Sequence, residues 1–385
     1  MSHLSFRRRT LSHLSALAVS LAFFIPAALS QQTTIYKPTD KKDTVVRGFK
    51  PTAGSDPNYR IYGGLSYSIV KHSTSKVPYA ASHTVGLNYS LSENSFHPYY
   101  ENLFPEAIAK WGIFSKIGYD QIRRANYFGM GNDVRRTTDN IRFNWLRTHH
   151  QYAMLGLSRV FGAEHEVNWS LLYDAVQVLD DKDRFIAKSR STIDPAEFEW
   201  QYFTGNRLSY TYRHLNNPHL PTKGLTWNTA ISYQESVKRS GHSFARYSTD
   251  AEAYFPFSSE VSYAFRAGVS TLTGNPDFYM YNAIGGTSTL RGYHRWRFYG
   301  KTAFYNQNEL RWIAAFDKGS IYGHLGLLAL YDLGRVWLPG ESSDKLHFGY
   351  GAGLILAPMD KVTVKTMYAI SNEDRRLHFS VGTSF

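Results

Sequence analysis

Residues 261–269 read VSYAFRAGV, and large or apolar side chains take every second position of this stretch. Successive side chains of a β-strand point to opposite faces, so Tyr263 and Phe265 share one face and Ser262 and Arg266 the other. The same alternation recurs in residues 225–233, 362–370 and 377–385. The pattern predicts an all-β protein whose strands each have one apolar and one polar face.

A soluble β-sandwich shows the same alternation, but three features favour a transmembrane antiparallel β-barrel. Aromatic residues make up 16% of the chain and gather near strand ends, as in the aromatic girdles of outer-membrane barrels. Many predicted strands run to roughly 10 residues or more, which is long enough to cross a bilayer at a tilt. Arg246, Asp250 and Glu252 share the polar face of one strand, which suits a wet lumen.

The number of strands follows from the alternation and from the parity of a barrel. The pattern predicts strands at residues 60–71, 80–91, 95–104, 110–119, 141–158, 164–178, 199–214, 223–236, 243–256, 258–271, 302–314, 319–334, 346–358, 361–371 and 375–385. Bacterial single-chain barrels have an even number of strands and both termini in the periplasm. Residues 272–300 then form an outer loop that occupies the lumen, and parity requires one more strand before it, within 38–52 or 121–135. The prediction is 16 strands, with 14 as the alternative.

The N-terminal region is predicted to direct export. Residues 1–30 have the features of a secretory signal peptide, with three arginines, an apolar stretch and small residues before a cleavage site after Ser30. The alternative is a membrane anchor, but the apolar stretch is short for a spanning helix of ~20 residues. Residues 31–58 are polar and too few for a separate domain, so they form a short periplasmic segment, and residues 59–385 form the barrel. The expected location is the bacterial outer membrane.

Composition argues against most catalytic and binding classes. The net charge is +12, but an exported protein does not meet nucleic acid, so outer-membrane lipids are the expected partners. For the charge itself, a solvated excess of Lys and Arg in loops is the preferred explanation. With no Cys, the chain has no disulfide, thiol nucleophile or Cys-based zinc site.

Histidine-containing segments give no catalytic site either. His149 and His150 are adjacent in a predicted strand and therefore point to opposite faces. His214, Asn217 and His219 suggest a hydrolase, but they lie around Pro218 and Pro221 and are better explained as a structural turn. The sequence predicts a protein that is not an enzyme and needs no metal or cofactor.

The long outer loop contains the most specific motif of the chain. Residues 284–293 read IGGTSTLRGY, residues 308–311 read NELR, and residues 331–334 read YDLG. Together they resemble the bacterial surface antigen superfamily of outer-membrane assembly and translocation barrels, the BamA/TamA-like proteins. The signature of that family is a Gly-Gly turn followed by Leu/Val-Arg-Gly-aromatic at the tip of a loop folded into the lumen. Weaker matches lie at residues 127–132 and 217–224, and the resemblance is good over residues 215–385.

Alternation places two carboxylates of these motifs on the lumen side of their strands. An arginine on an inward loop could bridge both, and a bidentate arginine–carboxylate pair is strong and geometrically exacting. The resemblance implies that such a lock pins the loop to the wall. Its residues would be Gly285, Gly286, Arg291, Gly292, Tyr293, Glu309 and Asp332. The alternative is a set of unrelated charges.

The resemblance also implies a function. Proteins or lipids would be inserted or translocated at the outer membrane through a weak seam between the first and last strands, whose unpaired backbone groups template an incoming strand. Gly382 and Phe385 of the last strand would lie at this seam. Residues 31–58 cannot hold the periplasmic POTRA domains of the usual members, so recruitment of client outer-membrane proteins would depend on a separate periplasmic partner. The alternatives are a diffusion channel for small anionic solutes and a structural barrel.

Overall fold

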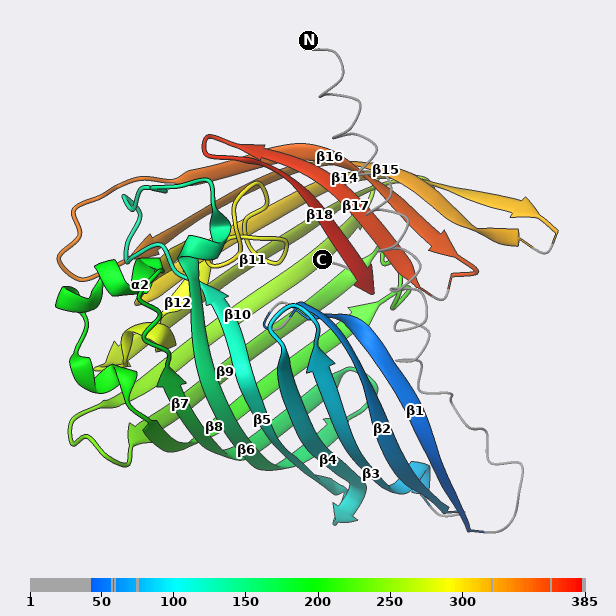
Figure 1. The fold of residues 1–385 in the computed structure, drawn as a ribbon. Coiled ribbons are helices and arrows are strands. Elements are labelled where there is room, and N and C mark those ends of the chain that lie inside the picture. Colours follow the sequence, from blue (N-terminus) through cyan, green and yellow to red (C-terminus); the bar gives the residue numbers. More distant parts are fainter. Residues whose placement is uncertain are drawn as a thin grey trace.

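The computed structural model describes residues 43–56, 58, 60–73, 76–319, 321–360 and 362–382. In this part of the chain, a 16-stranded antiparallel sheet follows the order of the sequence and curls into a barrel (Figure 1). Its strands are β1 (Thr44–Asp56), β2 (Arg60–Ser73), β3 (Lys76–Ser90), β4 (Ser95–Ile108), β5 (Trp111–Asn126), β6 (Trp145–Phe161), β7 (His165–Val178), β8 (Gln201–Leu215), β9 (Gly224–Ser236), β10 (Ser243–Pro256), β11 (Val261–Gly274), β14 (Thr302–Lys318), β15 (Ile321–Trp337), β16 (His347–Pro358), β17 (Thr363–Ser371) and β18 (Arg375–Gly382). The all-β class and the number of 16 strands are confirmed.

The strand that parity required is β1. It pairs with β2 along its whole length, from Thr44 opposite His72 to Asp56 opposite Arg60. The assignment of residues 31–58 to a segment before the first strand is therefore wrong from Thr44 onward. A proline at position 51 hides the pattern, because proline is rare inside strands, but an edge strand such as β1 tolerates it. The predicted signal peptide, residues 1–30, lies outside the described residues.

The outer face of the barrel is apolar and the inner face is polar. Large apolar side chains are exposed around the outside, including Leu171, Trp227, Ile231, Leu310, Trp312, Leu327, Tyr331 and Leu354. Polar and charged side chains such as Glu252, Gln307 and Asp332 are buried inside. This distribution is the reverse of a soluble fold, and an outer face of this kind is stable only against an apolar surrounding. None of the described helices is long and apolar enough to span a membrane.

The interior differs between the two halves of the barrel. On the C-terminal side, Ile313, Leu328 and Ile355 pack around Leu220, which the β8–β9 turn inserts into the lumen. On the N-terminal side, Glu101 and Lys116 form a 2.7 Å ion pair although their side chains are 45% and 48% exposed. One half of the lumen is therefore a dry core and the other is open to water.

In an antiparallel sheet every second connection lies at the same end. The long connections of this barrel all belong to one such set, so they lie together at one end. They are residues 127–144, 179–200, 275–301 and 338–346, which we call the cap, and residues 275–301 we call the plug loop (Figure 1). The cap contains α2 (Phe185–Lys188), the 3-10 helices η1 (Ile141–Asn144), η2 (Arg190–Thr192), η3 (Pro195–Phe198) and η4 (Phe278–Met280), and the short strands β12 (Asn282–Ile284) and β13 (Phe298–Gly300).

One buried side chain ties two cap segments together. Asn132 is fully buried, its Nδ2 donates to the Val336 carbonyl at 2.6 Å, and its Oδ1 accepts from the Val336 N–H at 3.1 Å. The Asn132 N–H also donates to Glu341 Oε1 at 2.6 Å. Tyr127, Phe278 and Tyr299 add an apolar cluster beneath these bonds. The cap is therefore a folded unit at this end of the barrel.

Asn132→Ala is expected to loosen the cap, because it leaves buried backbone groups of Val336 without their side-chain partners. The expected loss is about 1–3 kcal/mol in the free energy of unfolding in urea, with faster protease cleavage within residues 127–144. The matched control is Asn140→Ala in the same segment, which removes an exposed contact to the Arg142 N–H. Equal cleavage rates for the two variants would show that Asn132 does not hold the cap.

Candidate functional site

The plug loop enters the lumen as a small hairpin, in which β12 pairs with β13. A tight turn follows β12 and requires two glycines. Gly285 and Gly286 have φ values of +126° and +85°, in the region that side-chain-bearing residues avoid. A Cβ atom on Gly285 would also lie 2.2 Å from the His294 carbonyl oxygen. The turn carries the next residues of the motif toward the barrel wall.

Arg291 meets both predicted carboxylates at the wall. Its Nε and Nη2 donate to Asp332 Oδ2 and Oδ1 at 2.8 and 2.5 Å, which makes the pair bidentate. The Arg291 backbone N–H also donates to Asp332 Oδ2 at 2.8 Å, and Nη1 donates to Glu309 Oε1. All three side chains are 1% exposed or less. The structure thus brings together the three charges of the expected lock.

The charge cluster is larger than the sequence predicted. Glu309 Oε2 also accepts from Arg311 Nε at 2.7 Å and from Lys365 Nζ at 3.2 Å. Three cations therefore surround two carboxylates in one buried site. Arg311 could have been found from the sequence, because it stands two positions after Glu309 and so shares its face. Lys365 could not, because its strand meets the cluster only through the curvature of the barrel.

A histidine on the last strand also holds the loop tip. Gly292 N–H donates to His378 Nε2 at 3.1 Å, and His378 Nδ1 lies 3.0 Å from the Thr287 hydroxyl. Because Nε2 accepts, Nδ1 must carry the proton and donate to Thr287. This contact was not predicted from the sequence, and it links β18 directly to the plug loop.

Close packing fixes the loop tip against the neighbouring strands. The Tyr293 hydroxyl donates to Asn372 Oδ1 at 2.7 Å. A Cβ atom on Gly349 would lie 1.9 Å from the Arg291 carbonyl oxygen, so only glycine fits at this position of β16. The loop backbone therefore lies directly on the wall, which is why the arginine can reach both carboxylates.

The two predicted seam residues have different outcomes. Gly382 is the last residue of β18, with a φ of +131° and open space where a side chain would be. Phe385 lies outside the described residues. Strands β1 and β18 are the two ends of the sheet, and their described residues form no ladder with each other. In Figure 1 they appear as the blue and red edges of the barrel.

The histidine segments form local structure. Asn217 Oδ1 accepts from the His219 N–H at 2.8 Å and from the Leu220 N–H at 3.1 Å, which makes the segment the turn that the sequence predicted. His150 faces the lumen and lies 2.9 Å from Asp174 Oδ1, whereas His149 stacks on Trp200.

A second charged group ties the base of the plug loop to the cap. Glu197 of η3 accepts from the Phe278 N–H at 3.1 Å. Asp277, which is ion-paired with Arg239, lies beside it. Burial and the neighbouring negative charge of Asp277 raise the pKa of Glu197 from 4.5 to about 7.

Comparisons with known proteins give a family and a fold. The model of the Omp85 superfamily domain matches residues 78–385, which include the plug loop and the charge cluster. BamA from Haemophilus ducreyi lacking POTRA domains 1-3 is similar with a TM-score of 0.63 and 15% identity, over 96% of this chain and 78% of that chain. Comparison with curated protein sequences gives no match.

Two CdiB structures are also similar. CdiB from Escherichia coli has a TM-score of 0.55 and 15% identity, over 89% of this chain and 62% of that chain. CdiB from Acinetobacter baumannii has a TM-score of 0.51 and 13% identity, over 90% of this chain and 66% of that chain. At these identities the likeness shows a shared fold.

The charge cluster gives a mutational prediction. Arg291→Met leaves two buried carboxylates short of a cation, and Glu309→Gln leaves Arg291, Arg311 and Lys365 without their shared anion. Each is expected to cost about 3–5 kcal/mol in the free energy of unfolding in detergent, because a buried charge is left uncompensated. Lys365→Met in the Glu309→Gln background should recover part of the loss.

The control for the charge cluster is Glu101→Gln, which breaks the half-exposed pair with Lys116 and should cost no more than about 1 kcal/mol. If Glu309→Gln is as mild as this control, the cluster does not hold the plug loop.

The Glu197 carboxyl gives a pH dependence. Its pKa is higher in the folded protein than the ordinary 4.5, so the folded cap binds the proton more tightly than the unfolded chain. The folded cap around Glu197 therefore loses stability as pH rises from about 4.5 to about 7, because the deprotonated carboxylate is buried and faces the negative charge of Asp277.

Hydrogen exchange in residues 275–282, corrected for intrinsic rates, should accordingly show more frequent opening at about pH 8 than at about pH 5.5. Glu197→Gln should flatten this dependence, whereas Asp183→Asn, which changes an exposed carboxylate of the same cap, should keep it. Identical profiles for wild type and Glu197→Gln would contradict the assignment.

Proposed function

The chain belongs to the Omp85 superfamily, and from that premise we propose that it inserts or translocates proteins or lipids at the bacterial outer membrane. The observation that carries the proposal is a sheet whose first and last strands form no ladder with each other among the described residues, around a lumen that contains the plug loop and the Arg291 cluster. In this proposal the apolar outer face lies in the bilayer, the cap faces outward, and no catalytic chemistry is involved.

The plugged lumen argues against passive diffusion. The plug loop is fixed by the buried cluster around Arg291, and Leu220 fills the same half of the lumen from the opposite end. A pore through this half of the lumen would require both elements to leave, and the cluster would then have to open to water. Transport is therefore better placed at the wall of the barrel than along its axis.

The edge strands offer such a place. In the described part of the chain, β1 has 13 residues and β18 has 8, so a ladder between these residues cannot satisfy all backbone groups of β1. Exposed N–H and C=O groups at a strand edge pair readily with another extended chain. An outer-membrane protein client could add a strand at this seam, and a lipid could pass where the wall is weak.

A disulfide tether tests the proposal. The chain has no Cys, so pairs of cysteines, one within Thr44–Asp56 and one within Arg375–Gly382, give a clean cross-link across the seam. Each pair is expressed in a strain depleted of the wild-type protein, and outer-membrane proteins and surface lipids are quantified. Oxidation should remove a defined set of them, and reductant should restore it, because the tether keeps the seam shut.

The matched control is Ile231→Cys with Tyr247→Cys, which are register partners on β9 and β10 and are already joined by a ladder. This cross-link should change nothing. If a fully cross-linked seam leaves the membrane unchanged, translocation at the seam is excluded. If depletion itself has no effect but the purified barrel conducts ions steadily, the protein is a channel.

A further inference from the structure

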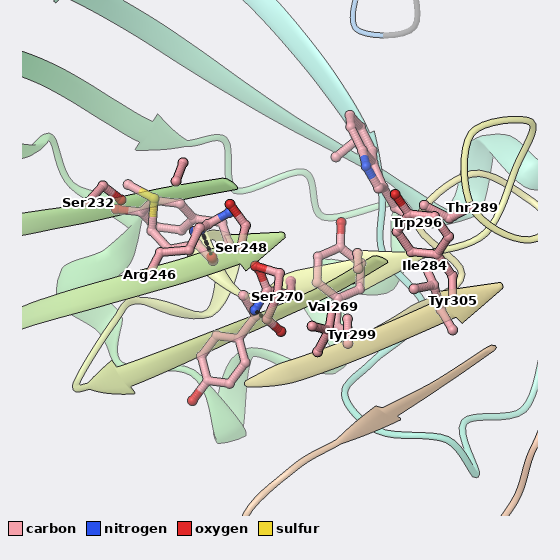
Figure 2. Close-up of a pocket in the computed structure, with 18 of the residues that line it drawn as sticks. Ser232, Arg246, Ser248, Val269, Ser270, Ile284, Thr289, Trp296, Tyr299 and Tyr305 are labelled. Atoms are coloured by element: carbon pink, nitrogen blue, oxygen red, sulfur yellow. Dashed lines mark hydrogen bonds between the residues drawn. The ribbon is translucent and has the colours of Figure 1, made fainter. Parts of the chain in front are cut away.

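Beside the plug loop, the lumen contains a cavity of about 560 Å³ (Figure 2). One side is the barrel wall from β5 to β11 together with β14, and the other is formed by the plug loop with the rings of Trp296 and Tyr299. Pockets for small molecules in proteins commonly have about 300–1,000 Å³, so this cavity is large enough for one. It is separate from the Arg291 cluster, none of whose members lines it.

Two arginines lie in one row across the cavity wall. In the strand register, Arg207 of β8 is opposite Ser232 of β9, and Ser232 is opposite Arg246 of β10. Register partners point to the same face, so the three side chains form a row with the hydroxyl between the two guanidinium groups. The two Cα positions are two strand spacings apart, about 10 Å, which allows both cations to reach one ligand from opposite sides.

Neither arginine of this row forms an ion pair within 4.0 Å among the described residues, although the charge of Asp174 acts on Arg246. Arg246 Nη2 donates to the Met280 carbonyl at 2.5 Å, as the dashed line in Figure 2 shows, and this contact orients the guanidinium at the cavity. No ion pair includes Arg207 or Arg246 in the described part of the chain, whereas Arg266 on the next strand is paired with Asp250 and Glu252. Two like charges side by side are costly unless an anion joins them.

The carboxylates that line the cavity are already engaged. Asp174 accepts from Gln234 Nε2 at 2.8 Å and lies 2.9 Å from His150 Nε2. Asp250 is paired with Arg266 and accepts from Asn228 Nδ2 at 3.3 Å. Both carboxylates are therefore engaged by other groups. The arginines that line the cavity are Arg207, Arg246 and Arg123, and Arg123 Nη1 lies 3.2 Å from His150 Nδ1.

We propose that this row binds a phosphate-class oxyanion, held between Arg207 and Arg246 with the Ser232 hydroxyl as a further donor. A guanidinium group can donate two parallel hydrogen bonds to two oxygens of a phosphate. Two guanidinium groups carry two positive charges, which balance a phosphate dianion, whereas a carboxylate carries only one negative charge. The rings of Trp296 and Tyr305 leave space for the organic part of a phosphate monoester. The open N-terminal half of the lumen gives the ligand a wet approach.

Binding to the purified barrel in detergent tests the proposal. The probes are inorganic phosphate and glycerol 3-phosphate, titrated calorimetrically at constant ionic strength in chloride. Saturable binding is expected, and Arg207→Gln and Arg246→Gln should each weaken it by at least about tenfold, because each removes charged hydrogen bonds. Arg213→Gln is the matched control, since Arg213 lies further along the same face of β8 and does not line the cavity.

The outcomes separate cleanly. Binding of both probes supports a site for the free oxyanion, and binding of glycerol 3-phosphate alone supports a site for a headgroup whose organic part contacts the rings. Arg246→Lys should keep more affinity than Arg246→Gln, which distinguishes a charge from a structural role. If folded wild type binds neither probe, or if both glutamine variants bind as wild type does, the proposal is wrong.

Discussion

The contact between Arg291 and the carboxylates of Asp332 and Glu309 is the constraint on which the arrangement of this barrel depends. Removing five charged side chains from water is costly, and the cost is recovered only when every partner is in place. If any one of these partners is missing, a buried charge is left uncompensated and the site is much less stable. The plug loop, β14, β15 and β17 must therefore adopt one relative position, and the glycines at 285, 286 and 349 allow the backbone to approach closely enough for it.

The plug loop determines how much of the lumen is filled by protein. Without it, sixteen strands with a polar inner face would enclose a continuous water-filled channel, as larger barrels do. The plug loop instead fills the side of the C-terminal strands, where Leu220 and its apolar neighbours complete a dry core. Water remains on the side of the first strands and in the cavity beside β8 to β10, where charged side chains keep their hydration. The same polar wall thus serves as a packing surface in one half and as a binding surface in the other.

The sequence predicted what depends on local pattern and missed what depends on curvature. Alternation identified most strands, parity required the one that Pro51 concealed, and the loop motif with Glu309 and Asp332 identified the family. Lys365 and His378 were not predicted as partners of the loop, because β17 and β18 meet it only through closure of the sheet. The arginine row at Ser232 was missed for a related reason. Cross-strand neighbours depend on register, and alternation within one strand does not contain it.

The two edges of the sheet are not equivalent, and the difference follows from the same lock. Strand β18 is held on one side by β17 and from within by His378, which contacts Thr287 and Gly292 of the plug loop. Strand β1 is held by its ladder with β2, and Val45, Val46 and Phe49 are exposed on its two faces. Segments with few buried contacts open at the lowest free energy. In the proposed function, we therefore expect the seam to open by movement of β1 away from β18, whose edge the plug loop holds through His378.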